Sequence, residues 1–155
     1  MTMSRIFQIN ASQGGVPKLP LAQAAVNADG LTCDAQEHLD VHGGPDRALC
    51  LYSLERILAL QNEGHPIFPG AAGENLTLVG LDWDTVAPGV VLQLGGEVVV
   101  EIVSYTQPCG TISAFFTDGR PARIAQKSHP GWSRVYARVV RGGEIAVADE
   151  VVIGG

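Results

Sequence analysis

Glycine pairs divide this chain into short apolar segments, and they constrain its fold more than any other feature. Four pairs separate runs of aliphatic residues: Gly14-Gly15, Gly43-Gly44, Gly95-Gly96 and Gly142-Gly143. Glycine makes up 19 of 155 residues, about 12% where roughly 7% is typical. Hydrophobic residues account for 46% of the chain and charged residues for only 17%. This composition predicts tight turns between buried strands, and it excludes a disordered or collagen-like chain.

Short segments rich in β-branched and other apolar residues predict the strands. Single strands are expected at Arg5–Ala11, Leu21–Asn27, Ala48–Tyr52 and Asn75–Val79. Two hairpins are expected to turn at glycine pairs, Val90–Leu94 with Glu97–Tyr105 and Ser133–Val140 with Glu144–Ile153. Together these segments predict a mainly β fold, a closed or nearly closed β-barrel.

One segment has a helical period instead. Ser53 is a good N-cap, and Leu54, Ile57, Leu58 and Gln61 share one face of the helix that follows. Gly64 and Pro66 end this helix. We therefore expect one clear α-helix, with a short helical turn at 82–86.

The charge balance limits the classes of partner. The net charge is −6 with a pI of about 5.0, so we expect no nucleic-acid partner. Arginine appears eight times and lysine twice. The planar arginine fork suits a small anionic ligand, although codon usage or chance explains the same bias.

Cysteine usage and the N-terminal sequence indicate the cellular setting. Cys33, Cys50 and Cys109 cannot all pair, and no C-x-x-C spacing is present. The N-terminal residues show neither a secretory signal pattern nor an apolar run of membrane-spanning length. We expect a cytoplasmic protein with free thiols and no membrane association.

Cys109 is the first candidate for chemistry. It follows a long predicted strand, between Pro108 and Gly110, where a thiol is positioned and accessible. A lone loop cysteine is also commonly inert. The sequence His42-Gly43-Gly44-Pro45-Asp46-Arg47 is the second candidate. It could present Asp46 and Arg47 to a polar ligand, form an H-x3-H zinc pair with His38, or simply be a turn.

Two further polar groups stand next to predicted strands. Glu74 and Asn75 follow Gly73 directly before a strand, which is also ordinary turn chemistry. Arg134, Tyr136 and Arg138 alternate along one strand and so share a face. That face either coats the exterior or lines an anion site.

The chain resembles the MOSC domain, the module at the C-terminus of molybdenum-cofactor sulfurases that also occurs as short stand-alone bacterial proteins. Three blocks carry the resemblance: HGGPDRALCLYS (42–53), GENLT (73–77) and SYTQPCG (104–110). It implies a single MOSC domain over residues 1–155 with a pyruvate-kinase-barrel-like fold. Many relatives place a basic residue near the motif cysteine, whereas Gly110 and Thr111 follow Cys109 here, so its activation would come from distant arginine or histidine residues.

The resemblance also implies a site. Cys109 would ligate molybdenum in a molybdopterin-type cofactor or carry sulfur as a persulfide. Arg47 and Arg134 are expected at the cofactor phosphate, and Asn75 at the pterin. The full set of expected pocket residues around Cys109 is His42, Asp46, Arg47, Glu74, Asn75, Arg134 and Arg138.

Two functions follow from this resemblance. The first is an oxidoreductase component that reduces N-hydroxylated compounds, with an electron-transfer protein as partner. The second is a sulfur carrier that accepts a persulfide on Cys109 from a PLP-dependent cysteine desulfurase. A barrel without chemistry, serving only as a binding module, is the third reading.

Overall fold

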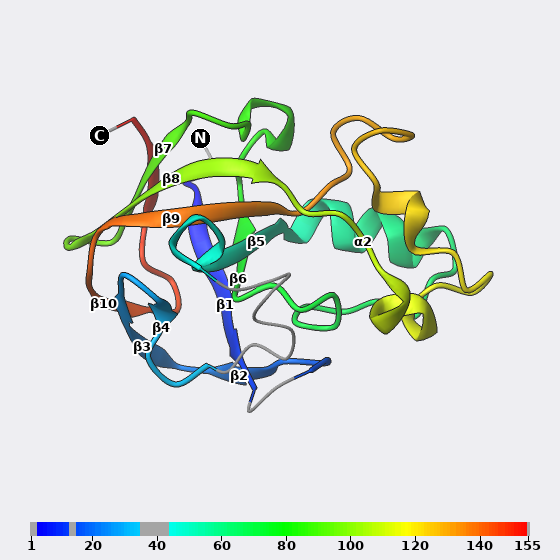
Figure 1. Cartoon of the computed structure of the whole chain (residues 1–155), viewed down its shortest axis with the longest axis horizontal. Helices are drawn as coiled ribbons and strands as arrows, with labels where there is room; N and C mark the ends of the chain where they lie inside the picture. Colours follow the sequence, from blue (N-terminus) through cyan, green and yellow to red (C-terminus); the bar gives the residue numbers. More distant parts are fainter. Residues whose placement is uncertain (1–2, 13–14, 35–43, 155) are drawn as a thin grey trace.

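The computed structural model describes residues 3–12, 15–34 and 44–154. Its larger sheet has eight strands and is shown with the rest of the chain in Figure 1. Their order is β11 (Val151–Ile153), β7 (Val91–Leu94), β8 (Val98–Tyr105), β9 (Val135–Arg141), β5 (Leu49–Ser53), β6 (Leu76–Val79), β1 (Arg5–Ala11) and β2 (Leu19–Leu21). A smaller sheet has the order β10 (Gly143–Ala146), β3 (Gln23–Asn27) and β4 (Gly30–Leu31).

The large sheet is mixed, and its strand order is open. Only β5 and β6 pair in parallel, and all other pairs are antiparallel. The start of β1 meets the residues before β11 through the Arg5–Glu150 bridge and a 2.9 Å bond from the Ile6 N–H to the Asp149 carbonyl. No pairing of named strands joins the two edges within the described residues. The mainly β class is therefore confirmed, whereas a closed barrel is not detected.

The core lies around strand β5, whose five residues are all buried. A strand covered on both faces reads as a continuous apolar run, and LCLYS fits that pattern. Fully buried aliphatic side chains come from strands on both sides of it, including Ile6, Ile9, Leu76 and Leu92. Burial of this kind contributes about 1.5–3 kcal/mol for each large side chain.

The predicted helix is α2 (Leu54–Asn62), and the Ser53 hydroxyl caps it by accepting a 3.1 Å bond from the Arg56 N–H. Leu54, Ile57 and Leu60 are its buried residues, whereas Leu58 is 51% exposed. The sequence placed Leu58 and Gln61 on one face with Leu54 and Ile57, but Leu58 and Gln61 are both exposed. At about 100° per residue, Leu58 lies about 40° beyond Leu54 on the side away from Ile57 and Leu60, so it falls at the solvent edge of that face.

The first predicted hairpin is confirmed, because β7 and β8 pair across Gly95-Gly96. The second is wrong: β9 pairs with β8 and β5, β10 pairs with β3, and β11 pairs with β7. At this glycine pair the chain crosses between sheets instead of turning back. A Cβ at Gly142 would lie 2.5 Å from the Val26 carbonyl oxygen, so the crossing requires glycine.

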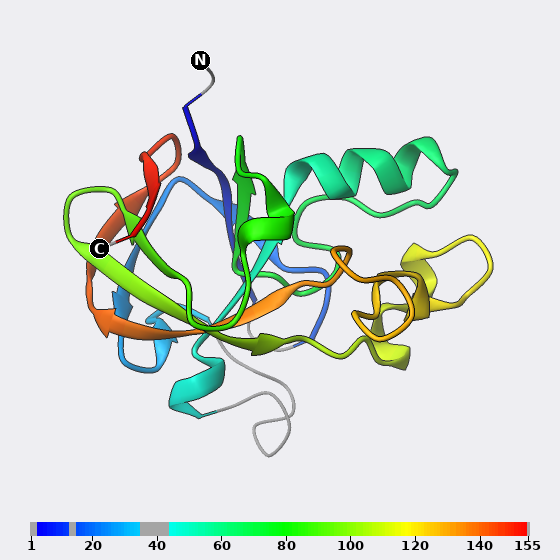
Figure 2. The ribbon, with the colours of Figure 1, turned by 90° about the horizontal axis from the view of Figure 1, so that it is seen from above.

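Four short 3-10 helices complete the described elements: η1 (Pro45–Arg47), η2 (Trp83–Thr85), η3 (Gly110–Phe115) and η4 (Pro121–Ile124). The helical turn expected at 82–86 is thus confirmed as η2. Helix α2 and the segment from η3 to η4 extend from the same end of the large sheet (Figures 1 and 2). Within the described ranges, no helix combines the length and apolar character that crossing a membrane requires.

Candidate functional site

Strand register brings some of the sequence candidates to one region of the sheet. Tyr136 lies opposite Cys50 on one side and opposite Ser104 on the other. The Cys50 carbonyl accepts a 2.7 Å bond from the Asn75 N–H, which adds the start of β6 to this row. Segments that are distant in sequence thus meet where β6 and β9 begin and β8 ends.

The Asn75 side chain ties this region together. Its Oδ1 accepts a 2.9 Å bond from the Cys50 N–H, and its Nδ2 donates to Asp34 Oδ2 at 2.9 Å. Asp34 also forms an ion pair with Lys18, at 2.7 Å from Nζ to Oδ1, and only 8% and 5% of the two side chains are exposed. Both the oxygen and the nitrogen of the Asn75 side-chain amide therefore form hydrogen bonds, and this side chain links strand β5 to the segment at Asp34.

Glu74 is a completely buried carboxyl group. Its Oε2 accepts bonds of 3.0 Å from the Gly70 N–H and from the Thr77 hydroxyl, while Oε1 has no hydrogen-bond partner in the described structure. Burial raises the pKa of Glu74, and the hydrogen bonds and the nearby Arg134 charge oppose this effect without overcoming it.

Arg134 is a buried cation beside Glu74, with 6% of the residue exposed. Its Nη1 donates a 2.6 Å bond to the Ala72 carbonyl, and its Nε has no partner among the described atoms. No carboxylate of the described residues forms an ion pair with it. The region therefore contains a guanidinium whose charge is not balanced by direct contact.

Cys109 is half-buried and lies four residues beyond the end of β8, directly before η3. Its Sγ is 2.8 Å from the Thr111 hydroxyl. Thr111 is one of the two residues that follow Cys109, near which the resemblance leads one to expect a basic residue. The thiol therefore has a local hydroxyl partner, which sequence reasoning missed.

Tyr136 links the two cysteines electrostatically. Burial raises its pKa to about 12, with Cys50 and Cys109 adding to this rise and Arg134 and Arg47 opposing it. The Arg47 guanidinium carbon lies 5.4 Å from the centre of the Tyr136 ring. The tyrosine stays protonated at neutral pH and can donate a hydrogen bond.

Cys50 differs from Cys109 in being fully enclosed. Burial raises the pKa of its thiol, and the nearby Arg134 charge partly opposes the rise. Its Sγ lies 3.7 Å from the Thr106 hydroxyl. A sulfur in this setting is a neutral thiol, and it packs as a small apolar group.

The remaining candidates divide into three groups. Arg138 is exposed and pairs with Glu101, so the structure does not bring it to the buried cluster. Asp46 is exposed on η1, next to Arg47. His42 and His38 lie outside the described residues. The described part of the chain contains no cluster of three histidine, cysteine, aspartate or glutamate residues that could hold a metal ion alone.

Sequence reasoning missed the buried Lys18–Asp34 pair, whereas it did place Tyr136 on the same strand face as Arg134, a face that could line an anion site. The strand alternation of Arg134 and Tyr136 was the available signal for the tyrosine. Lys18 and Asp34 gave no signal, because their contact depends on how two loops meet β6.

Comparison with known proteins agrees with this fold and these motifs. A model of the MOSC domain matches residues 38–152. The protein YflK of Bacillus subtilis (strain 168) is 32% identical over 137 residues, which cover 85% of this chain and 59% of YflK. A protein named Reductase from Gibberella moniliformis is 28% identical over 115 residues, covering 71% of this chain and 20% of that protein. The chain thus spans only part of the length of these relatives.

A solved structure shows the same fold. The crystal structure of YiiM from Geobacillus stearothermophilus matches with a TM-score of 0.78 at 28% identity, covering 98% of this chain and 75% of the other. The family match extends over most of the chain and includes η1, the start of β6 and the Cys109 loop. The chain belongs to the MOSC domain family.

Proposed function

We propose that this chain binds molybdenum cofactor, with the Cys109 thiolate as the protein ligand of the metal and Arg134 at the cofactor phosphate. The observation that carries the proposal is Arg134 itself. It is buried, its Nε has no partner in the described structure, and no described carboxylate pairs with it.

An unpaired buried charge is costly, because the protein interior replaces little of the lost hydration. Glu74 forms no ion pair with Arg134 in the described structure, and burial raises the pKa of its carboxyl group. A bound phosphate would supply both the missing charge and an acceptor for the Arg134 Nε–H, and guanidinium binds phosphate in a paired geometry.

The Cys109 thiol suits the metal of the cofactor, as Arg134 suits its phosphate. A bare metal ion would need several protein ligands, and the described residues offer no such cluster. A metal that arrives within an organic cofactor needs only one soft ligand, and a thiolate suits molybdenum. Cys109 is half-buried, so it is accessible while still held by the fold.

The surrounding residues would orient the thiolate and limit its hydration. The Thr111 hydroxyl, 2.8 Å from the sulfur, can donate a hydrogen bond to it. Tyr136 stays protonated and lies within electrostatic range of the same sulfur. When bound, the cofactor supplies a redox-active metal for the reduction of N-hydroxylated compounds.

The relative named Reductase supports an oxidoreductase role. In this proposal the chain works in the cytoplasm as one component, and a separate electron-transfer protein delivers the electrons. The chain's own part is to bind the cofactor and to present it for reaction.

The test is the molybdenum and pterin content of protein purified from a host that makes the cofactor. The unmodified chain should carry both in equal amounts, and Cys109→Ser should lose at least nine-tenths of the molybdenum. Cys33→Ser is the matched control, because Cys33 is an exposed thiol and belongs to none of the contacts above. Equal molybdenum in all three proteins, or none in any, would refute the proposal.

A sulfur carrier is the second candidate, and the accessibility of Cys109 favours it. Here the Cys109 thiolate attacks the persulfide of a cysteine desulfurase and takes its outer sulfur, while the desulfurase thiolate leaves. Incubation with a desulfurase and cysteine should then add the mass of one sulfur atom to Cys109. The carrier role does not use the buried Arg134, so the two proposals separate at that residue.

A further inference from the structure

Two buried charged side chains of the cluster each have one polar atom without a partner. Glu74 is completely buried, and its Oε1 accepts no hydrogen bond within the described residues. Arg134 is 6% exposed, and its Nε likewise has no partner among them. Proteins pair nearly all of their buried polar atoms, so these two exceptions are candidates for a functional role.

One short loop, residues 70–74, brings the two side chains together. The Glu74 side chain folds back onto this loop, where the Gly70 N–H donates to Oε2 at 3.0 Å. The same loop supplies the Ala72 carbonyl, which accepts the 2.6 Å bond from Arg134 Nη1. Ala72 and Glu74 are two residues apart, so their Cα atoms lie within about 7.6 Å of each other. The guanidinium and the carboxyl group are therefore neighbours, although no ion pair joins them in the described structure.

The two groups also act on the same neighbours through space. Burial raises the pKa of Glu74, and the Arg134 charge acts in the opposite direction. Burial likewise raises the pKa values of Cys50 and Tyr52, where Arg134 opposes the rise and Glu74 adds to it. Such effects need no direct contact and are strong where water is excluded. Each of the two groups is thus within electrostatic range of the other.

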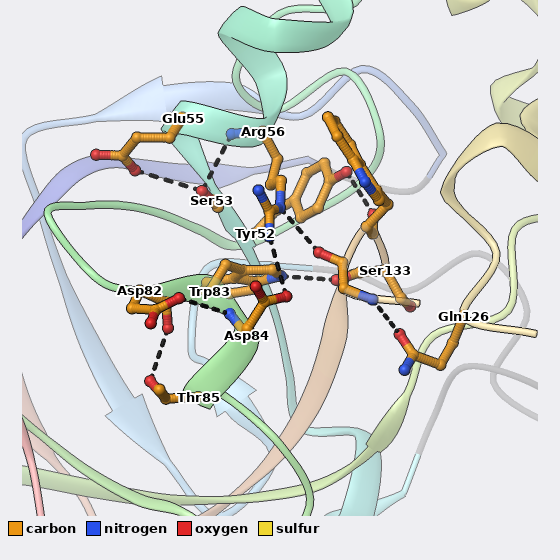
Figure 3. Close-up of polar contacts among 12 residues, drawn as sticks. Tyr52, Ser53, Glu55, Arg56, Asp82, Trp83, Asp84, Thr85, Gln126 and Ser133 are labelled. Atoms are coloured by element: carbon orange, nitrogen blue, oxygen red, sulfur yellow. Dashed lines mark hydrogen bonds and ion pairs between the residues drawn. The ribbon is translucent and has the colours of Figure 1, made fainter. Parts of the chain in front are cut away.

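The neighbouring thiol and phenol do not change charge in the physiological range. The raised pKa values of Cys50 and Tyr52 keep both groups neutral at neutral pH. Figure 3 shows the Tyr52 hydroxyl in a hydrogen bond, which it donates to the Trp132 carbonyl at 2.6 Å.

The nearby lysine is already balanced. The Lys18 N–H donates to the Gly70 carbonyl at 2.9 Å, which places this residue beside the loop. Its ammonium group forms a 2.7 Å ion pair with Asp34. Among the described groups around Arg134, Glu74 is therefore the one whose charge can respond to a ligand.

An anion bound at Arg134 would change the balance of charge at Glu74. Before binding, the guanidinium favours the ionised carboxylate, and burial opposes it. After binding, the anion offsets the guanidinium charge and repels the carboxylate. A buried carboxylate without a counter-charge is costly, so the group takes up a proton.

We propose that the binding of an anion at Arg134 is coupled to the uptake of one proton by Glu74. The inference rests on the proposed function, which makes the cofactor phosphate the natural anion at this arginine. One proton moves from solvent to the Glu74 carboxylate as the anion binds, and it returns to solvent when the anion leaves. Because binding takes up a proton, the affinity for the anion falls as pH rises.

The probe for the test is sulfate, which stays fully ionised between pH 5 and pH 8. Protein made in a host without molybdenum cofactor is titrated with sulfate by calorimetry, in two buffers with different ionisation enthalpies, so that proton uptake is measured directly. We expect net proton uptake within this pH window and an affinity at least tenfold weaker at pH 8 than at pH 5. Arg134→Gln should bind sulfate at least tenfold more weakly than the parent.

A matched pair of variants assigns the proton. The amide oxygen of Glu74→Gln can still accept from the Gly70 N–H and the Thr77 hydroxyl, but the side chain no longer titrates. This variant should bind sulfate without proton uptake, and its affinity should change by less than about threefold across the window. Glu144→Gln makes the same change at an exposed residue of β10 and should behave like the parent.

The outcomes separate this inference from the cofactor proposal. No sulfate binding, no proton uptake by the parent, the same uptake by Glu74→Gln as by the parent, or equal sulfate binding by Arg134→Gln would each overturn the coupling. None of these measurements involves molybdenum. A chain that never carries molybdenum would refute the cofactor proposal alone, whereas sulfate bound without a proton would refute the coupling alone.

Discussion

Cys50 and Cys109 lie near the same tyrosine but in opposite environments. Cys50 is buried with a raised pKa, whereas Cys109 is half-buried and Cys33 is exposed. Alkylation requires the thiolate and access to it. We predict that iodoacetamide labels Cys33 and Cys109 in the native protein and leaves Cys50 unlabelled until denaturant is added.

Peptide mass spectrometry after timed labelling measures all three thiols in one sample, and the denatured protein is the control. Labelling of native Cys50 at the rate of Cys33 would contradict the burial that the structure gives it.

Glu74 makes the stability depend on pH. Burial raises its pKa above the ordinary value of about 4.3, so the folded state holds the proton more tightly than the unfolded chain. Its contribution is fully present below the unfolded pKa and is lost as pH rises toward the folded pKa. Glu74→Gln lacks this titration, so its stability relative to the parent should increase from pH 5 to pH 8.

Urea unfolding of both proteins at four pH values in this window measures that difference. A constant difference across the window would mean that Glu74 titrates as it does in the unfolded chain.

Several site residues could be recognised from the sequence, but their environments could not. Glu74 and Arg134 stand beside strands in local patterns that suggest polar function. Their burial depends on segments that are distant in sequence: Asn10 of β1 donates to the Glu74 carbonyl, and Arg134 donates to the Ala72 carbonyl. The Lys18–Asp34 pair likewise forms only when two loops meet at Asn75.

At the level of elements, helix α2 offers a direct comparison of two leucines. Leu60 is fully buried and Leu58 is 51% exposed, although both lie on the same helix. Leu60→Ala should lower the free energy of unfolding by about 2–5 kcal/mol, because it leaves a cavity. Leu58→Ala should change it by less than about 0.5 kcal/mol. Chemical denaturation checks both values, and equal losses would contradict the orientation of the helix.

The glycine pairs offer a second comparison. A Cβ at Gly142 would lie 2.5 Å from the Val26 carbonyl oxygen, whereas one at Gly96 would meet no atom within 4 Å. Gly142→Ala should therefore destabilise the fold by about 1–3 kcal/mol through steric strain. Gly96→Ala is the matched control and should be nearly neutral. The midpoints of thermal unfolding of the two variants measure the difference, and similar midpoints would argue against the close crossing at Gly142.

These two glycine pairs also show that a local sequence pattern predicts a strand or a turn but does not predict which strands pair. Gly95-Gly96 and Gly142-Gly143 have the same local signature, and only the first is a hairpin turn. At the second, β3 provides the partner for β10, and β3 lies more than a hundred residues earlier. Strands and helix follow from local periodicity, whereas strand partners depend on contacts across the whole chain.

At the scale of the whole molecule, the sheet brings one buried cation to the ends of several strands. Arg134 lies directly before β9, Asn75 directly before β6, and Cys109 in the loop after β8. The net charge of −6 gives no sign of this local positive charge. The fold therefore buries a cation without an ion pair to any described residue inside an acidic protein, and the proposed cofactor binding rests on this cation.

The central claim is tested most directly by the molybdenum content of Arg134→Gln, measured with the stability of the same variant without cofactor. An arginine kept for an anionic ligand costs stability when the ligand is absent, because its buried charge is unpaired. We predict that Arg134→Gln loses at least nine-tenths of its molybdenum in a competent host. The cofactor-free variant should be more stable than the cofactor-free parent by about 1 kcal/mol. A variant that is less stable and keeps its full molybdenum content would contradict the account, because Arg134 would then serve the fold alone.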